Sequence, residues 1–309
     1  MSNDRFGVRW GLAGGTTLAS VAETLEAARF AEQARFDSFW VSQAAGVDPV
    51  VALACIADQV PGLAEVGTSV VPLYGRHPLP FAQMVRTAQN ALGGRLTLGV
   101  GAASAWYAEG KLGVPWDKPF SFTREFLDAL QPLLAGHAAD VTGDQLSAHA
   151  GLEIEARPTP ILLAALGPRM LRFAGGRVQG TTLGQCGPRT IARYIRPHLE
   201  EGAAKAGRSE PPRIMALVRL AVTEDRAAAK ALAREISGFY QAIPSYARVL
   251  EHEGLAEPAD LHLIGSWQEV LDGIAAYAEA GVTDLRLQVA APDERSRAAS
   301  REALAAYLA

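Results

Sequence analysis

Two glycine-containing motifs have the residue types and spacing best suited to ligand binding. The first is AALGPR, at residues 164–169. It ends an apolar run and opens a helical pattern with a proline at its start, which leaves free backbone N–H groups at the positive end of a helix dipole. Such a helix start suits a phosphate group, although a simple strand-to-helix turn explains the pattern equally well.

The second motif is GVGAAS, at residues 99–104. It begins like a dinucleotide-binding fingerprint, but Ser104 replaces the third glycine and no amphipathic helix pattern follows directly. The sequence therefore disfavours a Rossmann site. We interpret the motif as a backbone surface against which a flat ring system packs, because a large side chain at Gly101, Ala102 or Ala103 would intrude there.

Few other residues at the predicted strand ends can titrate. The lysines fall in predicted loops or helices, which argues against a Schiff-base aldolase. The six histidines are scattered without an H-x-H or H-E-x-x-H pattern, and Glu109 is the one convincing carboxylate near a strand end. A metal-dependent hydrolase and a glycosidase are both disfavoured, so we expect no metal site and a cofactor that supplies the chemistry.

The elements that must position these motifs alternate between strand and helix. Apolar runs such as VGTSVVPL and RIMALVRLAV are typical of strands covered on both faces in a parallel sheet. Eight strand–helix units favour an α/β fold, a closed (β/α)8 barrel, whose active sites lie at the carboxyl ends of the strands. Pro168 and Pro188 are expected in first turns of helices, with Asp48 and Ser266 as helix caps.

The whole chain, residues 1–309, is predicted to form one barrel domain with two extra segments. The first is a hairpin near residues 138–156, and the second is a helical insertion near residues 225–262. Cys55 is expected to pack in the core of a helix, whereas Cys186 is placed in a loop.

Composition excludes several classes of partner. The chain is 49% hydrophobic and 20% charged, which suffices for a large core. A net charge of −4 and the lack of Lys/Arg runs argue against nucleic acid and anionic membrane surfaces. No stretch reaches the roughly 18 apolar residues of a membrane span, and the N-terminus lacks a signal-peptide pattern. A cytoplasmic location is therefore expected.

Three longer stretches carry a family resemblance: FDSFWVSQ, VGTSVVPLYGRHPLPFAQMVRTAQNALGGRLTLGVGA and PILLAALGPRMLRFAGGRVQG. They resemble the bacterial luciferase-like monooxygenase superfamily, in particular its actinobacterial coenzyme F420-dependent oxidoreductases. The match runs over nearly the whole chain and includes GFYQAIPSYARVLEHEG in the helical insertion. The resemblance implies a TIM barrel of the luciferase-like type, the deazaflavin coenzyme F420 as cofactor, a small-molecule substrate and a homodimer.

The same resemblance implies a set of cofactor-binding residues. A non-proline cis peptide between Ser69 and Val70 would back the middle ring of the cofactor, although an ordinary trans strand is the alternative. Gln43 would contact the deazaflavin head, and the phosphate would lie at Ala165, Leu166 and Gly167, helped by residues 184–187. The full predicted set is Gln43, Thr68, Ser69, Val70, Gly101, Ala102, Ser104, Ala165, Leu166, Gly167 and Gly184.

One departure from the family pattern concerns the proton. Several family members have an acid–histidine pair after the motif WVS, where this chain has Gln43 and Ala44. A proton would then come from water or from another group within hydrogen-bond reach. The candidates are His77, Ser104, Tyr107 and Glu109. For His77 a capping role is the alternative, and for the stretch SAWYAEGKLG, which contains Tyr107 and Glu109, the alternative is a packed lid loop.

Two further charged residues are interpreted without a catalytic role. Asp37 starts its strand at the end away from the site, so we expect a structural role. Arg76 is expected on a solvated face, with contact to an anionic part of the cofactor tail as the alternative.

These observations favour a reductase that transfers a hydride from reduced F420 to an electron-poor C=C or C=N bond. Oxidation of an alcohol is disfavoured because Ala44 cannot act as a base. The alternatives are an FMN-dependent luciferase-like monooxygenase and a non-catalytic barrel that binds a flavin or another ligand. The physiological substrate is not predicted.

Overall fold

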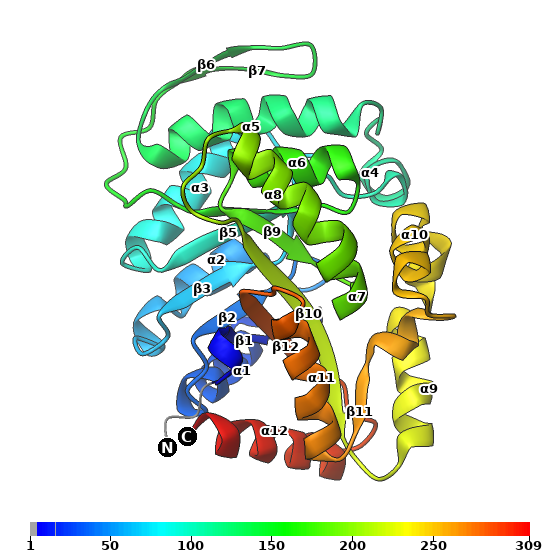
Figure 1. The fold of residues 1–309 in the computed structure, drawn as a ribbon. Coiled ribbons are helices and arrows are strands. Elements are labelled where there is room, and N and C mark those ends of the chain that lie inside the picture. The colour runs from blue at the N-terminus through cyan, green and yellow to red at the C-terminus, as the bar shows by residue number, and fades with distance from the viewer. Residues whose placement is uncertain (1–4, 16) are drawn as a thin grey trace. The chain divides into compact units, whose positions relative to one another are not determined.

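The computed structural model describes residues 5–15 and 17–309 (Figure 1). These residues divide into two compact units. We call residues 15, 17–29 and 40–164 the N-terminal unit, and residues 5–14, 30–39 and 165–309 the C-terminal unit. Helix α1 (Val21–Gln33) and strand β2 (Ser38–Val41) are divided between the two.

The N-terminal unit is built on parallel strands that pair with β5. Strand β5 (Leu96–Gly101) pairs with β3 (Glu65–Thr68), the two-residue β4 (Val71–Pro72) and β8 (Ile161–Ala164). Every residue of β3 and β5 is buried, as the apolar runs predict for strands covered on both faces. The helices of this unit are α2 (Pro49–Cys55), η2 (Ala57–Gln59), α3 (Pro78–Ala91), α4 (Ala105–Leu112) and α5 (Pro119–Ala135).

An antiparallel hairpin is added to this unit. Strands β6 (Ala139–Thr142) and β7 (Ser147–Ala150) pair with Ala139 opposite Ala150. Figure 1 shows the hairpin beside α5.

The C-terminal unit contains a second set of parallel strands, in the order β9-β10-β12-β1, with β11 beside the end of β10. Their bounds are β1 (Arg9–Ala13), β9 (Gly180–Leu183), β10 (Arg213–Val222), β11 (Leu263–Gly265) and β12 (Asp284–Val289). Its helices are η1 (Arg5–Gly7), α6 (Pro168–Arg177), α7 (Pro188–Thr190), the π-helical turn η3 (Ile191–Ile195), α8 (Arg196–Lys205), α9 (Arg226–Ser237), η4 (Gly238–Ala242), α10 (Pro244–Glu253), η5 (Pro258–Leu261), α11 (Trp267–Glu279) and α12 (Glu294–Leu308).

Ion pairs hold the starts of several of these strands. Asp284, only 2% exposed, accepts hydrogen bonds from Arg213 at 2.6 and 3.1 Å and forms an ion pair with Arg9 at 3.3 Å. Asp37 accepts a hydrogen bond from the Trp10 backbone N–H at 2.7 Å. The predicted structural role of Asp37 is confirmed.

The predicted helix starts are also confirmed. Asp48 accepts hydrogen bonds from the backbone of Val50 and Val51, and Ser266 forms a capping box with Glu269. Pro168 and Pro188 stand in the first turns of α6 and α7.

Two local predictions are wrong. The stretch SAWYAEGKLG is not a loop, because residues 105–112 form the helix α4 directly after β5. Cys55 is exposed rather than packed in the core, because it ends α2 on the face away from its buried residues. Cys186 is the buried cysteine. None of the helices in the described residues is long and apolar enough to cross a membrane.

Candidate functional site

A short interruption separates β3 from β4 at Ser69 and Val70, and the peptide bond between these two residues is cis. The cis geometry expected from the family resemblance is confirmed. Thr68 and Ser69 are buried at 0% and 6% exposure, whereas Val70 is partly exposed. We call Thr68, Ser69 and Val70 the ledge.

Hydrogen bonds fix the ledge from both neighbouring segments. The Thr68 hydroxyl donates to the Gly99 carbonyl at 2.8 Å and accepts from the Gly99 N–H at 2.9 Å. The Ser69 carbonyl accepts from the Ser42 hydroxyl at 2.6 Å, and the Val70 carbonyl accepts from the Gln43 N–H at 3.3 Å. The ledge therefore keeps its shape through bonds within the protein, and it presents Val70 as an apolar surface.

The glycines of β5 are explained by this close packing. A Cβ on Gly99 would lie 2.0 Å from the Thr68 carbonyl oxygen, and a Cβ on Gly101 would lie 3.2 Å from Val70 and 3.3 Å from Ala164. Ala103 has a positive φ of 59° although it is not glycine, and the Ala102 carbonyl accepts a bond from the Trp116 ring N–H at 3.1 Å. The protein's own packing thus accounts for Gly99 and Gly101, and a bound ring is not required to explain them.

Gln43 is oriented by a neighbouring arginine. Its Oε1 accepts a hydrogen bond from Arg76 at 2.8 Å, and Arg76 also reaches Asp48 at 3.3 Å. The Arg76 guanidinium lies 5.0 Å from the centre of the Phe81 ring. Because the amide oxygen is engaged, the Gln43 Nε2 group is left to donate a hydrogen bond to a ligand. Arg76 therefore positions Gln43 instead of lying on a solvated face.

His77 uses both ring nitrogens within the fold. It is the N-cap of α3, where Nδ1 accepts from the Leu79 N–H at 3.2 Å, and Nε2 lies 2.9 Å from the Ser147 carbonyl of the hairpin. The carbonyl can only accept, so Nε2 carries the proton. The geometry therefore matches the capping alternative for His77.

The other candidate proton donors belong to α4. Ser104 caps the helix by accepting from the Tyr107 N–H at 3.4 Å, and Glu109 accepts from the Trp116 N–H at 3.3 Å. Tyr107 is half-buried, and Trp106 is 68% exposed. Ser104 and Glu109 thus have structural bonds, whereas the Tyr107 hydroxyl is the candidate with no such bond among the described residues.

Two helix N-termini in the C-terminal unit differ in how they are filled. At α7, the Glu253 carboxylate accepts from the backbone N–H groups of Arg189 at 3.2 Å and Thr190 at 2.7 Å. A Cβ on Gly187 would lie only 2.2 Å from the Glu253 carboxyl carbon. The protein therefore supplies its own anion at α7, which closes this end of the predicted phosphate loop.

The N-terminus of α6 has free space beside it. Its N-cap residue, Gly167, has no side chain to cap the helix, and a Cβ on Gly167 would meet nothing within 4 Å. Ala165 is buried, whereas Leu166 and Gly167 are partly exposed. Gly184, the other predicted contact, has the Tyr246 hydroxyl 3.8 Å from the position of an added Cβ.

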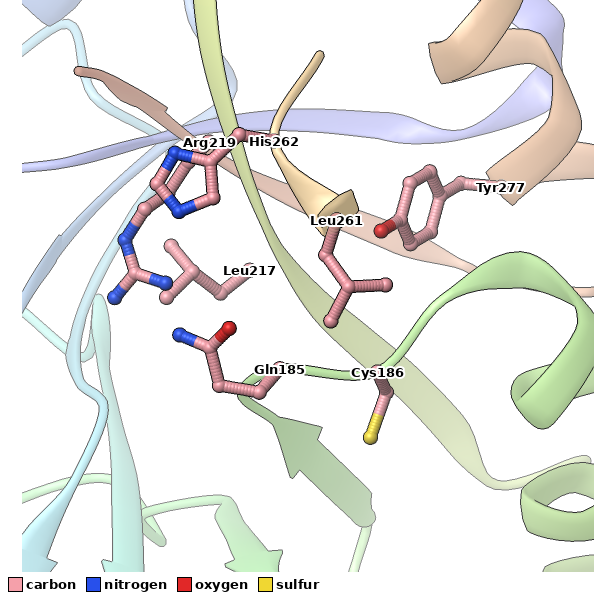
Figure 2. A pocket seen from close by; sticks show the side chains of 7 residues that line it. All are labelled: Gln185, Cys186, Leu217, Arg219, Leu261, His262 and Tyr277. Carbon is pink, nitrogen blue, oxygen red and sulfur yellow. The ribbon is translucent and has the colours of Figure 1, made fainter. Parts of the chain in front are cut away.

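A pocket that the sequence analysis missed lies in the C-terminal unit. We call it the arginine pocket, and it is lined by Gln185, Cys186, Leu217, Arg219, Leu261, His262 and Tyr277 (Figure 2). Figure 2 shows the Gln185 amide pointing toward the Arg219 guanidinium, with the His262 ring on the same side. An arginine within the apolar run RIMALVRLAV was the signal in the sequence, because a charged residue in a covered strand needs a specific role.

Burial dominates the electrostatics of the arginine pocket. It lowers the pKa of His262 to about 3, and the neighbouring Arg219 acts in the same direction. It also lowers the pKa of Arg219 and raises those of Tyr277 and Cys186. At neutral pH the histidine is therefore uncharged, and the thiol and phenol keep their protons.

Comparison with known proteins places these features in a family. The model of the luciferase-like monooxygenase family matches residues 7–284. The chain belongs to the luciferase-like monooxygenase family. The resemblance seen in the sequence is thus confirmed.

Two relatives illustrate the range of this luciferase-like family. The 5,10-methylenetetrahydromethanopterin reductase of Methanolobus tindarius is 27% identical over 241 residues, which cover 77% of this chain and 73% of the relative. Rv3520c of Mycobacterium tuberculosis, whose name assigns it provisionally to the coenzyme F420-dependent oxidoreductases, is 27% identical over 311 residues, with 94% and 85% coverage.

A solved structure confirms the fold. An F420-dependent secondary alcohol dehydrogenase in complex with an F420-acetone adduct superposes with a TM-score of 0.81 at 20% identity, over 96% of this chain and 98% of that chain. At this identity the likeness concerns the fold alone. The fold is the predicted (β/α)8 barrel of the luciferase-like type.

Proposed function

We propose that the protein is a coenzyme F420-dependent oxidoreductase that reduces an electron-poor C=C or C=N bond of a small organic substrate. When bound, the deazaflavin would supply the hydride. The proposal is supported by membership of the luciferase-like family and by relatives whose names include a methylenetetrahydromethanopterin reductase and an F420-dependent oxidoreductase.

The observation that carries the proposal is the free space at the N-terminus of α6. At α7 the backbone N–H groups meet Glu253, whereas at α6 a Cβ added to Gly167 would meet nothing within 4 Å. A phosphate of the cofactor fits there because helix N-termini stabilise anions. We assign this role to Ala165, Leu166 and Gly167, helped by Gly184 directly after β9.

In the N-terminal unit, we assign the ring system to the ledge, to the backbone of Gly101 and Ala102, and to Ser104. Gln43, whose Oε1 accepts a hydrogen bond from Arg76, would donate through Nε2 to the head of the ring. These groups bind and orient, and they contribute to the rate by holding the reacting atoms in place, which can account for several kcal/mol of barrier.

The direction of reaction follows from the missing base. Ala44 is exposed after β2 and cannot accept a proton, so we assign the reductive direction. The Tyr107 hydroxyl, or water, would deliver the proton that accompanies the hydride. Steady reduction of F420 by 2-propanol or another alcohol would contradict this assignment.

The test is a side-by-side fluorescence titration of the protein with F420 and with FMN. We expect micromolar or tighter binding of F420 and weak binding of FMN. The opposite preference would favour an FMN-dependent monooxygenase, and binding of neither would leave only the non-catalytic barrel.

Gly167→Asp sharpens this titration. Aspartate is a good helix N-cap, and its Cβ meets nothing within 4 Å, so the fold should keep its stability. Its charge would repel the phosphate, and we expect F420 binding to weaken by on the order of tenfold. Gly167→Asn is the matched control, because it caps equally well without the charge. Equal F420 affinities for the two variants would show that the cofactor phosphate does not bind at the N-terminus of α6.

A cytoplasmic homodimer belongs to the same proposal. Sedimentation of the purified protein at micromolar concentration tests the dimer, and a monomer there would contradict it.

A further inference from the structure

The arginine pocket gathers hydrogen-bonding groups that the fold does not satisfy. Gln185 is 5% exposed and His262 is 8% exposed. Both amide atoms of Gln185 and the Nε2 atom of His262 have no hydrogen-bond partner among the described residues. Buried polar groups are normally paired, so each of these atoms calls for an explanation. Gln185 also has a positive φ of 54°, which is uncommon for a residue other than glycine.

The charge in the pocket is positive. Arg219 is 6% exposed, and its Nε donates to the Gln288 Oε1 at 2.9 Å. Its other side-chain partner is the Tyr240 phenol. Both partners are neutral, and within the described residues Arg219 forms no ion pair with a carboxylate. A buried charge normally has a counter-charge, because its transfer from water is costly.

Two further charged groups lie near Arg219 and Tyr277. Arg286 of β12, 5% exposed, is close enough to Arg219 for its pKa to be lowered to about 10, by burial first and by Arg219 second. After burial, the Glu253 carboxylate is the next cause that raises the pKa of Cys186 and of Tyr277. Glu253 is already bonded to the backbone N–H groups of Arg189 and Thr190, so it does not neutralise Arg219.

The size of the pocket limits what can enter. Its free volume is about 10 Å³, on the order of one water molecule, so no whole small molecule fits inside. The pocket therefore has room for a single oxygen atom of an end group that binds at its mouth. Its position fits a substrate site, because Gln185 follows β9 and Arg219 lies near the carboxyl end of β10, the strand ends at which barrel enzymes bind their ligands.

We propose that the arginine pocket binds an oxyanion group of the substrate, a carboxylate or a phosphate, through Arg219, Gln185 and His262. The word substrate rests on the proposed reductase function, whereas the anion site itself does not. Arg219 supplies the charge and directed N–H donors, the Gln185 amide nitrogen donates, and the neutral His262 ring donates through Nε2 in the tautomer that carries its proton there.

The first experiment measures anion binding without any cofactor. The melting temperature is followed as inorganic phosphate or acetate is added at constant ionic strength with chloride. We expect a saturable rise for the wild-type protein. Arg219→Met should weaken this binding by on the order of tenfold, and Gln185→Leu by several-fold, because each removes donors to a charged group.

The matched control is Arg297→Met, the same substitution at an arginine of α12 whose side chain is 46% exposed and pairs with Glu294. It should leave the phosphate response unchanged. A wild-type protein with no saturable response to either anion, or an equal loss in Arg297→Met and Arg219→Met, would overturn the anion site and leave a hydrated pocket. The wild-type titration decides this even if Arg219→Met fails to fold.

The second experiment distinguishes the substrate from the cofactor tail as the source of the anion. F420 is titrated into wild-type protein and Arg219→Met. Affinities within threefold of each other support a substrate site, whereas a loss of tenfold or more would assign the pocket to the tail and overturn the substrate assignment. If the wild-type protein binds phosphate in an Arg219-dependent way but not F420, the proposed function fails and the anion site remains.

Discussion

The ledge and the arginine pocket differ in whether their buried polar groups have hydrogen-bond partners. In the ledge, the Thr68 hydroxyl both donates to and accepts from Gly99, and the Ser69 carbonyl accepts from Ser42. In the pocket, Gln185 and His262 keep buried polar atoms without partners in the described chain. A satisfied network holds its shape alone, whereas an unsatisfied one gains its bonds only when a ligand arrives.

The largest effect on stability is expected where the ledge network is cut. Thr68→Val keeps the side-chain shape but removes both bonds to the Gly99 backbone, which leaves a buried N–H and a buried carbonyl unpaired. We expect the free energy of unfolding to fall by about 3 kcal/mol. Urea titration measures it, with Thr68→Ser, which keeps the hydroxyl, as the milder control. A loss below that of Thr68→Ser would show that the ledge does not depend on this hydroxyl.

The second effect is a pH dependence set by the pocket. His262 has a pKa of about 3 in the folded protein and an ordinary value of 6.5 when unfolded. Between these values the unfolded state binds the extra proton, so stability falls as the pH drops. By pH 5 this contribution is about 2 kcal/mol, at about 1.4 kcal/mol for each pH unit.

Unfolding of wild-type protein and of His262→Leu between pH 7.5 and 5 isolates this contribution, since the other titrating groups are common to both. The acid-side slope should be shallower in the variant. Parallel slopes would mean that His262 is protonated in the folded protein.

The third effect should have the opposite sign to the first. Arg219→Met replaces a buried charge, which has no carboxylate partner among the described residues, with an apolar side chain. We therefore expect stability to stay equal or to rise by about 1 kcal/mol. Arg213→Met is the contrasting variant, because Arg213 pairs with the buried Asp284, and its loss should cost about 3 kcal/mol. Similar losses in the two variants would remove the distinction between paired and unpaired arginines.

The smallest effect concerns Gln43 and the arginine that orients it, Arg76, in the N-terminal unit. Arg76→Met frees Gln43 and breaks the 3.3 Å contact with Asp48, at a cost of about 0.5 kcal/mol in stability. We expect F420 affinity to fall by about threefold, because Gln43 loses its fixed orientation. Arg76→Lys keeps the charge and should lie between. An unchanged F420 affinity in Arg76→Met would show that Gln43 does not contact the deazaflavin ring.

Local sequence signals predicted the fold well. The continuous apolar runs gave the strands because both faces of β3 and β5 are covered. Asp48 and Ser266 were identified as caps because a cap acts within a few residues. The helix α4 was missed because its residues Trp106, Tyr107 and Gly110 are weak helix formers. Cys55 was misplaced because a short apolar helix does not reveal which face is covered.

Contacts distant in sequence were beyond such signals. The Glu253 carboxylate closes α7 from 64 and 63 residues away, and the Ser147 carbonyl engages His77 from 70 residues away. Gln185, Arg219 and His262 come from three separate places in the chain: the end of β9, strand β10 and the helical segment before β11. Charged residues inside apolar strand runs, Arg219 and Arg286, were the available hint, and the meaning of Arg219 depended on its having no carboxylate partner among the described residues.

The helical segment between β10 and β11 carries a consequence for evolution. Residues 226–262 form one uninterrupted stretch, and it contributes Leu261 and His262 to the pocket wall, Tyr240 to Arg219 and Glu253 to α7. The strands β9, β10 and β12 lie outside it. Mutation or recombination confined to residues 226–262 can change one wall of the pocket while the strands that carry Arg219 and Arg286 stay unaltered. Paralogues can therefore diverge in ligand preference by changes in this one segment.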